Sequence, residues 1–203
     1  HLIGLDLANS QFRGAVVNLR GEIHHRVSIP VQERDGEAAL ALVHQLLDEL
    51  IESADIPILG IGIGTPGLMD AEHGIVRTAV NLDWQDLPLV QMLTERYGLP
   101  VYIANDSQVA ALGEFTFGQH DDLESLAVLK VGRGIGAGII LAGDLHYGDS
   151  YGAGEIGHFR VVDGGEKCRC GQYGCLETVS SNQAIVRQAR RSAISPATSL
   201  HNY

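Results

Sequence analysis

The sequence predicts an α/β protein of two lobes that face each other across a cleft. Three observations predict this fold class: strand-like and helix-like segments alternate along the chain, one strand-and-corner pattern occurs twice, and glycine-rich stretches follow several of the strands. With 203 residues, 45% of them hydrophobic, the chain is long enough to bury a substantial core. We expect a first lobe over residues 1–104 and the start of an incomplete second lobe over residues 105–203.

The first lobe is expected to run β-β-β-α-β-α-β. Its strands are predicted at residues 2–7, 12–19, 22–31, 58–67 and 101–104. The tight Arg20-Gly21 corner indicates a hairpin between the second and third strands. The fourth strand is almost entirely apolar, as a buried central strand requires. Helices are predicted at residues 37–51, where apolar side chains form one stripe, and at residues 87–97.

The second lobe is expected to restart the pattern of the first. After a predicted helix at residues 107–117, strands are expected at 126–131 and 138–141. Residues 14–23 align without gaps with residues 136–145, and each copy is a strand that ends in a glycine-acid corner. Any two β-hairpins can share such residues. The alternative is a duplicated β-β-β-α-β-α unit, the ribonuclease H-like architecture of the actin, hexokinase and Hsp70 ATPases, whose glycine hairpins approach nucleotide phosphates from both sides.

Charge and composition restrict the partners of the chain. The formal net charge of −11 repels a phosphate backbone, so these residues alone are not expected to hold DNA. No apolar run approaches the roughly 20 residues of a membrane helix, and no secretory leader pattern is present. We therefore expect a soluble cytoplasmic protein without a membrane partner. Because His1 enters a strand pattern almost at once, the chain is interpreted as a piece of a longer protein.

The cysteines form one cluster with a histidine upstream. Cys168, Cys170 and Cys175 lie within eight positions, and their odd number argues against a disulfide framework. With His158 they offer one imidazole and three thiolates, a tetrahedral set that leaves no position for water and is typical of structural zinc. Glycines at 171 and 174 allow a short loop to turn the sulfur atoms inward. The alternative is a group of reduced thiols with His158 elsewhere.

The string from Cys168 to Glu177, with Glu-x-Gly-His upstream at residues 155–158, resembles the signature of the ROK family of repressors, uncharacterised reading frames and sugar kinases. The resemblance covers essentially the whole chain. It implies an actin- and hexokinase-like fold, a structural Zn²⁺ ion, a monosaccharide site at the lobe interface and a homodimer. Family members usually continue well beyond this length, which implies that much of the second lobe is missing here.

The resemblance also implies which residues bind the sugar. The matching positions are Gly67, Asn81, Asn105, Asp106, Glu155, His158 and Glu177. Vicinal hydroxyls both donate and accept hydrogen bonds, so carboxylates and amides are natural partners. His158 can serve twice, with one ring nitrogen on zinc and the other on a sugar hydroxyl. Asn105 and Asp106 can also be interpreted as a helix N-cap before Ser107, and the two interpretations are compatible.

Two loops distinguish kinases from sensors in this family. In the kinases the aspartate at the position of Asp106 is the general base, and glycine loops hold the phosphates of Mg-ATP. The first loop reads Asp-x-Gly-Gly-Thr in the kinases. Here it runs from Asp6 to Ser10, with Ala8 and Asn9 in place of the glycines and Ser10 as the remaining hydroxyl. Side chains at these positions exclude the close backbone approach that glycine permits.

The second loop keeps Gly132, Gly134 and Gly136 but has Arg133 where the kinases usually have threonine. It is either a phosphate loop or a β-turn inherited without function. An intact sugar and zinc site beside a degenerate first loop resembles the repressor branch, whose members carry a helix-turn-helix and change DNA affinity when sugar binds. We expect the chain to be the sugar-sensing effector domain of a transcriptional regulator. A monosaccharide effector binds to this domain, and DNA is bound by a helix-turn-helix outside these residues. The alternative is an ATP-dependent, glucokinase-like sugar kinase.

Overall fold

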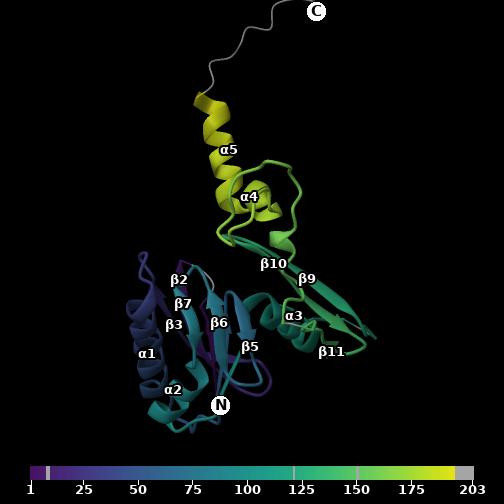
Figure 1. Cartoon of the computed structure of the whole chain (residues 1–203). Coiled ribbons are helices and arrows are strands. Elements are labelled where there is room, and N and C mark those ends of the chain that lie inside the picture. The colour runs from purple at the N-terminus through teal and green to yellow at the C-terminus, as the bar shows by residue number, and fades with distance from the viewer. Residues whose placement is uncertain (8–9, 121, 150, 195–203) are drawn as a thin grey trace, which may run out of the picture. The chain divides into compact units, whose positions relative to one another are not determined.

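The computed structural model describes residues 1–7, 10–120, 122–149 and 151–194 (Figure 1). The chain divides into two compact units, which are described separately. The first unit comprises His1–Val128 and Ala137–Gly154, and the second comprises Leu129–Gly136 and Glu155–Tyr203. The predicted boundary between lobes at residues 104 and 105 stays a prediction.

A mixed sheet forms the centre of the first unit. Its strand order is β3-β2-β1-β4-β8, with bounds β1 Leu2–Asp6, β2 Gln11–Val17, β3 Ile23–Pro30, β4 Ile61–Thr65 and β8 Val101–Asn105. β2 is antiparallel to β1 and β3, whereas β4 is parallel to β1 and β8. β2 alternates exposed and buried side chains, as expected for a strand with one face on a core. The strands predicted for the first lobe are therefore confirmed, with ends that differ by up to three residues from the predicted bounds.

The helices of the first unit pack on this sheet. Their bounds are α1 Gly36–Glu52, α2 Leu89–Tyr97 and α3 Asp106–Phe117. α1 contacts β2 and β3, and α3 contacts β4 and β8. The buried stripe of α1 consists of Ala39, Leu42, Val43, Leu46, Leu47 and Leu50. The stripe fills the core against side chains such as Phe12, which is fully buried.

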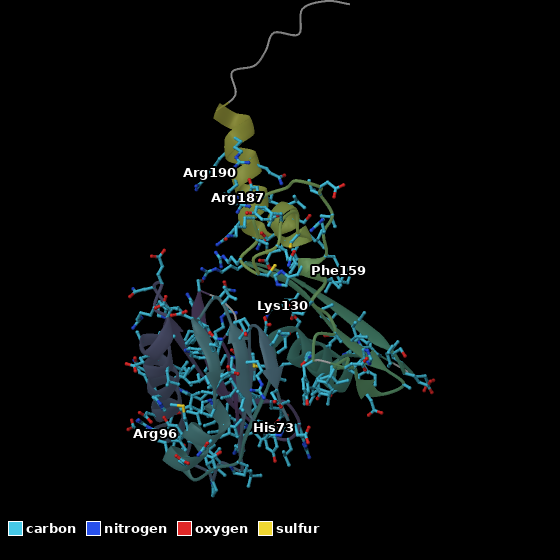
Figure 2. All side chains as sticks on the ribbon, viewed as in Figure 1. His73, Arg96, Lys130, Phe159, Arg187 and Arg190 are labelled. Atoms are coloured by element: carbon cyan, nitrogen blue, oxygen red, sulfur yellow. The ribbon has the colours of Figure 1, made fainter. Side chains whose placement is uncertain are left out.

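α1 and α2 are also joined by polar contacts at the surface of the first unit. The Tyr97 hydroxyl donates to Asp48 Oδ1 at 2.8 Å. Arg96, labelled in Figure 2, pairs with the other carboxylate oxygen of Asp48 at 2.9 Å. Because this pair is half exposed, it contributes little by itself, and the packing of apolar side chains dominates.

Three short strands of the first unit were not predicted. β5 Leu68–Asp70, β6 Ile75–Ala79 and β7 Trp84–Leu87 form a small antiparallel sheet. The predicted element order for the first lobe is therefore wrong between β4 and α2, because these short strands do not alternate between buried and exposed side chains. Tertiary contacts hold them instead: Trp84 is buried and its Nε1 donates to the Gly36 carbonyl at 2.9 Å. Gly67, just before β5, and Asn81, in the turn between β6 and β7, lie at the same end of this sheet.

A second meander follows α3. β9 Leu126–Val131, β10 Ile135–Leu141 and β11 Asp144–Leu145 form a sheet in the order β11-β10-β9 (Figure 1). The two segments of the predicted repeat both fold as hairpin corners, β2 to β3 and β10 to β11. Each corner has its glycine, Gly21 or Gly143, at a positive φ. This correspondence supports the duplicated unit rather than two unrelated hairpins.

The second unit contains little regular structure. A 3₁₀ turn at Ile156–His158 precedes the cysteine loop, and the loop leads into α4 Leu176–Ser180 and α5 Asn182–Ile194. α5 is tied to the loop by Arg187, labelled in Figure 2, which pairs with Glu166 at 3.0 Å. Among the residues that the structure describes, no helix is long and apolar enough to cross a membrane.

Candidate functional site

The cysteine loop and His158 bring four ligand atoms together. The imidazole of His158 and the sulfur atoms of Cys168, Cys170 and Cys175 all lie within 4.8 Å of one another. Cys168 Sγ is 3.5 Å from His158 Nδ1, and the sulfur atoms of Cys170 and Cys175 are 3.8 Å apart. The predicted ligand set therefore occupies one place in the second unit.

The separations of 3.5 and 3.8 Å match those between ligands of a tetrahedral zinc ion. With Zn–S bonds near 2.3 Å and Zn–N bonds near 2.0 Å, two sulfur ligands lie about 3.8 Å apart and a sulfur and a nitrogen about 3.5 Å apart. Burial raises the pKa of the Cys168 thiol and raises that of Cys175 to about 12. Two buried thiols are thus protonated without a cation, and a bound cation would stabilise the thiolate form instead.

Local backbone structure aims the sulfur atoms inward. The Cys168 N–H donates to the Gln172 carbonyl at 2.7 Å, and the Gly171 N–H donates to the Cys168 carbonyl at 3.0 Å. Gly171 and Gly174 both have a positive φ, as their predicted role in the loop requires. Cys168 and Cys175 are buried, while Cys170 is exposed.

Glu155 lies beside the second ring nitrogen of His158. Glu155 Oε2 is 3.6 Å from His158 Nε2, and both side chains are about one-third exposed. Since Nδ1 faces Cys168, a metal on Nδ1 would leave the proton on Nε2. The pair then presents one N–H donor and one carboxylate acceptor side by side, which suits a hydroxyl that accepts from one and donates to the other.

Glu177, the third candidate ligand of the second unit, contacts the glycine loop. It lies in the first turn of α4, and its Oε2 accepts the backbone N–H of Ile135 at 3.1 Å. A carboxylate has further lone pairs, so this bond leaves Glu177 able to accept from another donor. Sequence reasoning treated Glu177 only as a sugar ligand, and no local pattern pointed to Ile135, which lies 42 residues away.

In the first unit, Asn105 joins two of the predicted sugar segments. Its Oδ1 caps α3 by accepting the Ser107 N–H at 2.8 Å, and its Nδ2 donates to the Gly67 carbonyl at 3.0 Å. The capping interpretation of Asn105 is therefore confirmed. Asp106 is the first residue of α3, where the helix dipole favours a carboxylate. Asn81 is exposed in the turn between β6 and β7.

Two features near these residues were not predicted. The Thr65 hydroxyl, at the end of β4 opposite Asn105, is fully buried without a partner in the part of the chain that the structure describes. Buried Asp70 accepts from the backbone and the ring of His73 and pairs with Arg77 at 2.6 Å. No spacing rule marks either residue, because their importance depends on which strands become neighbours.

The candidate phosphate loops lie at the ends of β1 and β9. Asp6 ends β1 and Ser10 is exposed immediately before β2. Ala8 and Asn9, on which the predicted loss of the first loop depends, lie outside the described residues. In the second loop, the Gly132 N–H donates to the Gly134 carbonyl at 2.9 Å and closes a tight turn. Gly136 is already part of β10.

The fold and the metal cluster define a class of protein, and comparison with known proteins identifies the family. The mixed sheet with its second meander matches actin- and hexokinase-like sugar kinases and their relatives. The ROK family model matches residues 2–201, and the chain belongs to the ROK family. The predicted family and fold are therefore confirmed.

Both branches of the family are among the similar proteins. A glucokinase of Halalkalibacterium halodurans is 36% identical over 92% of this chain and 58% of its own length. A putative xylose repressor of a Caldicellulosiruptor species is 40% identical over 91% of this chain and 47% of its own length. The crystal structure of a ROK glucokinase from Streptomyces griseus with glucose and AMPPNP has a TM-score of 0.86, with 33% identity over 95% of this chain and 61% of that one. The chain thus spans less than two thirds of each.

Proposed function

We propose that the chain is the sugar-sensing effector domain of a ROK-family transcriptional regulator. In this proposal a monosaccharide binds to it and changes the DNA affinity of a helix-turn-helix located outside these residues. The regulator acts in the cytoplasm as a homodimer, and a structural zinc ion on the His158 and cysteine cluster maintains the second unit. The proposal concerns the whole protein, of which this chain is the part that recognises sugar.

The observation that carries the proposal is the loop after β1. It runs from Asp6 through Leu7, Ala8, Asn9 and Ser10 without a glycine. Phosphoryl transfer depends mainly on positioning and charge stabilisation around the γ-phosphate, and glycine loops provide that close backbone contact in the kinases. Since this loop has none of those glycines, the sequence supports sugar binding better than it supports binding of the nucleotide phosphates.

The sugar would be held by paired hydrogen-bonding groups. In the second unit, His158 Nε2 and Glu155 provide a donor and an acceptor for one hydroxyl, with the zinc ion on Nδ1 fixing the ring. Glu177 adds a carboxylate. In the first unit, Asn105 and Asp106 follow β8, and Gly67 and Asn81 lie in neighbouring loops. Amides and carboxylates in pairs are what vicinal hydroxyls require.

An ATP-dependent sugar kinase is the second candidate. Asp106 stands where the kinases have their general base, and it is half-exposed at the start of α3. Relatives named glucokinase include proteins that are 34 to 37% identical to the chain. In that reading Asp106 takes the proton from the attacking sugar hydroxyl, and the second glycine loop contributes to holding Mg-ATP.

One experiment separates the two candidates. The intact zinc-loaded protein is first screened against pentoses, hexoses and N-acetylated sugars, with xylose first because a relative is named a putative xylose repressor. It is then incubated with Mg-ATP and the sugar that binds, and sugar phosphate is followed directly. We expect no product and a sugar-dependent change in DNA binding. Turnover near the roughly 1 to 100 per second typical of kinases would overturn the regulator proposal.

A further inference from the structure

Residues 132–136, here called the glycine turn, comprise the turn between β9 and β10 and the first two residues of β10. They are held by neighbouring segments of the second unit. The Ile135 N–H donates to Glu177 Oε2 at 3.1 Å. The Gly132 carbonyl accepts the Asn182 N–H, at the start of α5, at 2.9 Å. Gly157 lies against the Ile135 carbonyl so closely that a Cβ there would overlap it. The turn is thus contacted on three sides by residues 155–182, which include the candidate metal ligands and are here called the zinc-bearing segment.

The glycine at 134 makes room for the Glu177 carboxylate. A Cβ on Gly134 would lie 2.8 Å from Glu177 Oε2, and among the described residues Glu177 supplies its only neighbours beyond the adjacent residues within 4 Å. Gly132, in the same turn, has no such neighbour within 4 Å of its Cβ position in the described part of the chain. Neither residue adopts a positive φ, so both tolerate a side chain as far as the backbone is concerned. Close approach to Glu177 is therefore a physical reason for glycine at 134 that involves no phosphate.

The metal cluster fixes the position of Glu177. Cys175, a candidate zinc ligand, is the N-cap of α4, and Glu177 follows two residues later in the first turn. The start of α4 is further held by the Leu176 N–H, which donates to the Phe159 carbonyl at 2.9 Å. Phe159 directly follows His158, the other end of the ligand set. A cation that fixes both ends would therefore fix the helix that carries Glu177.

We propose that Glu177 is a positioning residue that fixes the glycine turn to the zinc-bearing segment, so that the order of this turn depends on bound zinc. A hydrogen bond to an ionised carboxylate is stronger than one between neutral groups, and Glu177 accepts such a bond from the backbone N–H of Ile135, the first residue of β10. The proposal goes beyond sugar recognition and holds whether the whole protein is a regulator or a kinase.

The first test compares Glu177→Ala with Glu166→Ala. Both acids belong to the second unit, but Glu166 pairs with Arg187 and Arg191 on α5 and not with the turn. In the zinc-loaded chain we expect Glu177→Ala to speed hydrogen exchange of the Ile135 amide roughly tenfold or more, because the variant loses the charge-assisted bond from this N–H to the Glu177 carboxylate. Metal analysis should still find one zinc per chain. Glu166→Ala should leave the Ile135 amide unchanged.

The second test displaces the carboxylate without removing it. Gly134→Ala should push Glu177 Oε2 away and raise exchange at Ile135, while the matched Gly132→Ala should not, because its Cβ meets open space. The effects of Gly134→Ala and Glu177→Ala should not add in the double variant, since both break one bond. Glu177→Gln keeps an oxygen that accepts the N–H and should restore part of the protection.

The third test removes the metal. Chelation should raise Ile135 exchange in the wild-type chain to the level of Glu177→Ala, and should add little to that variant at the same amide. Unchanged exchange at Ile135 in zinc-loaded Glu177→Ala, or in metal-free wild type, would overturn the proposal. If Glu177→Ala lost its zinc, Gly134→Ala with zinc retained would decide: exchange equal to that of Gly132→Ala would also overturn it.

Discussion

The two units are stabilised by different means. The hydrophobic core of the first unit draws on residues from Ile3 to Ile103, including Phe12 and Leu46, which are fully buried. Among the described side chains of the second unit, the buried apolar ones are Ile135, Cys168, Cys175 and Ala184. Two of these four are metal-ligand candidates. A segment that buries so little apolar surface needs another source of stability, and a structural metal is a common one.

The units also differ in charge. The first unit has six Lys and Arg residues against 21 Asp and Glu residues, whereas the second has eight against four. The formal charge is therefore −15 in the first unit and +4 in the second, which together give the overall −11. Electrostatic repulsion of a phosphate backbone is therefore expected from the first unit only. Composition averaged over a whole chain conceals such a division.

The largest expected effect is the loss of structure in the second unit when metal is removed. Structural zinc contributes about 10 to 16 kcal/mol of apparent binding free energy in small zinc-finger peptides, so chelation should expose residues 155–180 to hydrogen exchange and proteolysis. The first unit should stay folded. Its fluorescence probe is Trp84, the single tryptophan of the chain, which is buried there.

The control for metal removal is readdition of zinc, which should restore protection of the second unit. Substitution of Cys175 by Ser should mimic the chelated state without any chelator, because it removes a fully buried ligand. Protein purified without chelator that contained no zinc would contradict this prediction. So would chelation that destabilised the first unit, seen as a shift of the unfolding transition followed by Trp84 fluorescence, because only the second unit is expected to depend on the metal.

The next largest effect is expected from a cavity in the first unit. Phe12→Ala should cost about 3 to 5 kcal/mol of unfolding free energy, because it removes a fully buried aromatic side chain from the core. Urea unfolding followed by Trp84 fluorescence measures it. Zinc content should stay at one per chain. Leu19→Ala is the matched control, since Leu19 is 74% exposed, and a change beyond about 0.5 kcal/mol there would contradict the burial assignment.

Sequence reasoning succeeded where the fold follows from local pattern. The strands of the main sheet are mostly apolar, α1 has a long apolar stripe, and turn glycines such as Gly21 and Gly98 mark the ends of elements. It failed for β5, β6 and β7, where Trp84 and Asp70 become buried only because distant segments pack on them. These strands are short, and exposed polar residues such as Arg77 and Gln85 interrupt their apolar pattern, so their existence depends on tertiary contacts.

The same distinction holds for the candidate site. The cluster of candidate metal ligands could be predicted because His158 and the cysteines are close in sequence and their chemistry restricts their use. The cap at Asn105 followed from its place before a helix. The bond between Glu177 and Ile135 could not be predicted, since it joins segments 42 residues apart through a backbone N–H that carries no sequence signal.

A smaller effect is expected from the candidate sugar ligands, one taken from each unit. Asp106→Ala or Glu155→Ala should weaken sugar binding by about 1 to 3 kcal/mol, roughly 5-fold to 150-fold, because each removes a hydrogen-bonding partner of a hydroxyl. Calorimetry on zinc-loaded protein measures it. Glu52→Ala, at the exposed end of α1, should bind as wild type. Unchanged affinity in both ligand variants would place the sugar elsewhere.

The smallest effect, confined to the first unit, concerns pH. The hydrogen bonds from His73 and then Arg77 lower the pKa of Asp70 to about 2 and, in return, Asp70 raises the pKa of His73. The lowered carboxyl pKa stabilises the fold at pH values above the unfolded-state pKa near 4, and this contribution is lost as the pH falls toward 2. The raised histidine pKa stabilises the fold below about pH 6.5, and this contribution is lost at higher pH. The stability that Asp70→Asn removes, followed by Trp84 fluorescence, should therefore be greatest between about pH 4 and 6.5 and should shrink on both sides of that window.

Asp86→Asn is the control, because Asp86 pairs with the same Arg77 at 3.1 Å but is 63% exposed and should matter little at any pH. A difference between Asp70→Asn and wild type that stayed constant down to pH 2 would mean that this cluster does not set the acid sensitivity of the first unit, and would leave protonation of the zinc ligands in the second unit as the main acid-sensitive step of the chain.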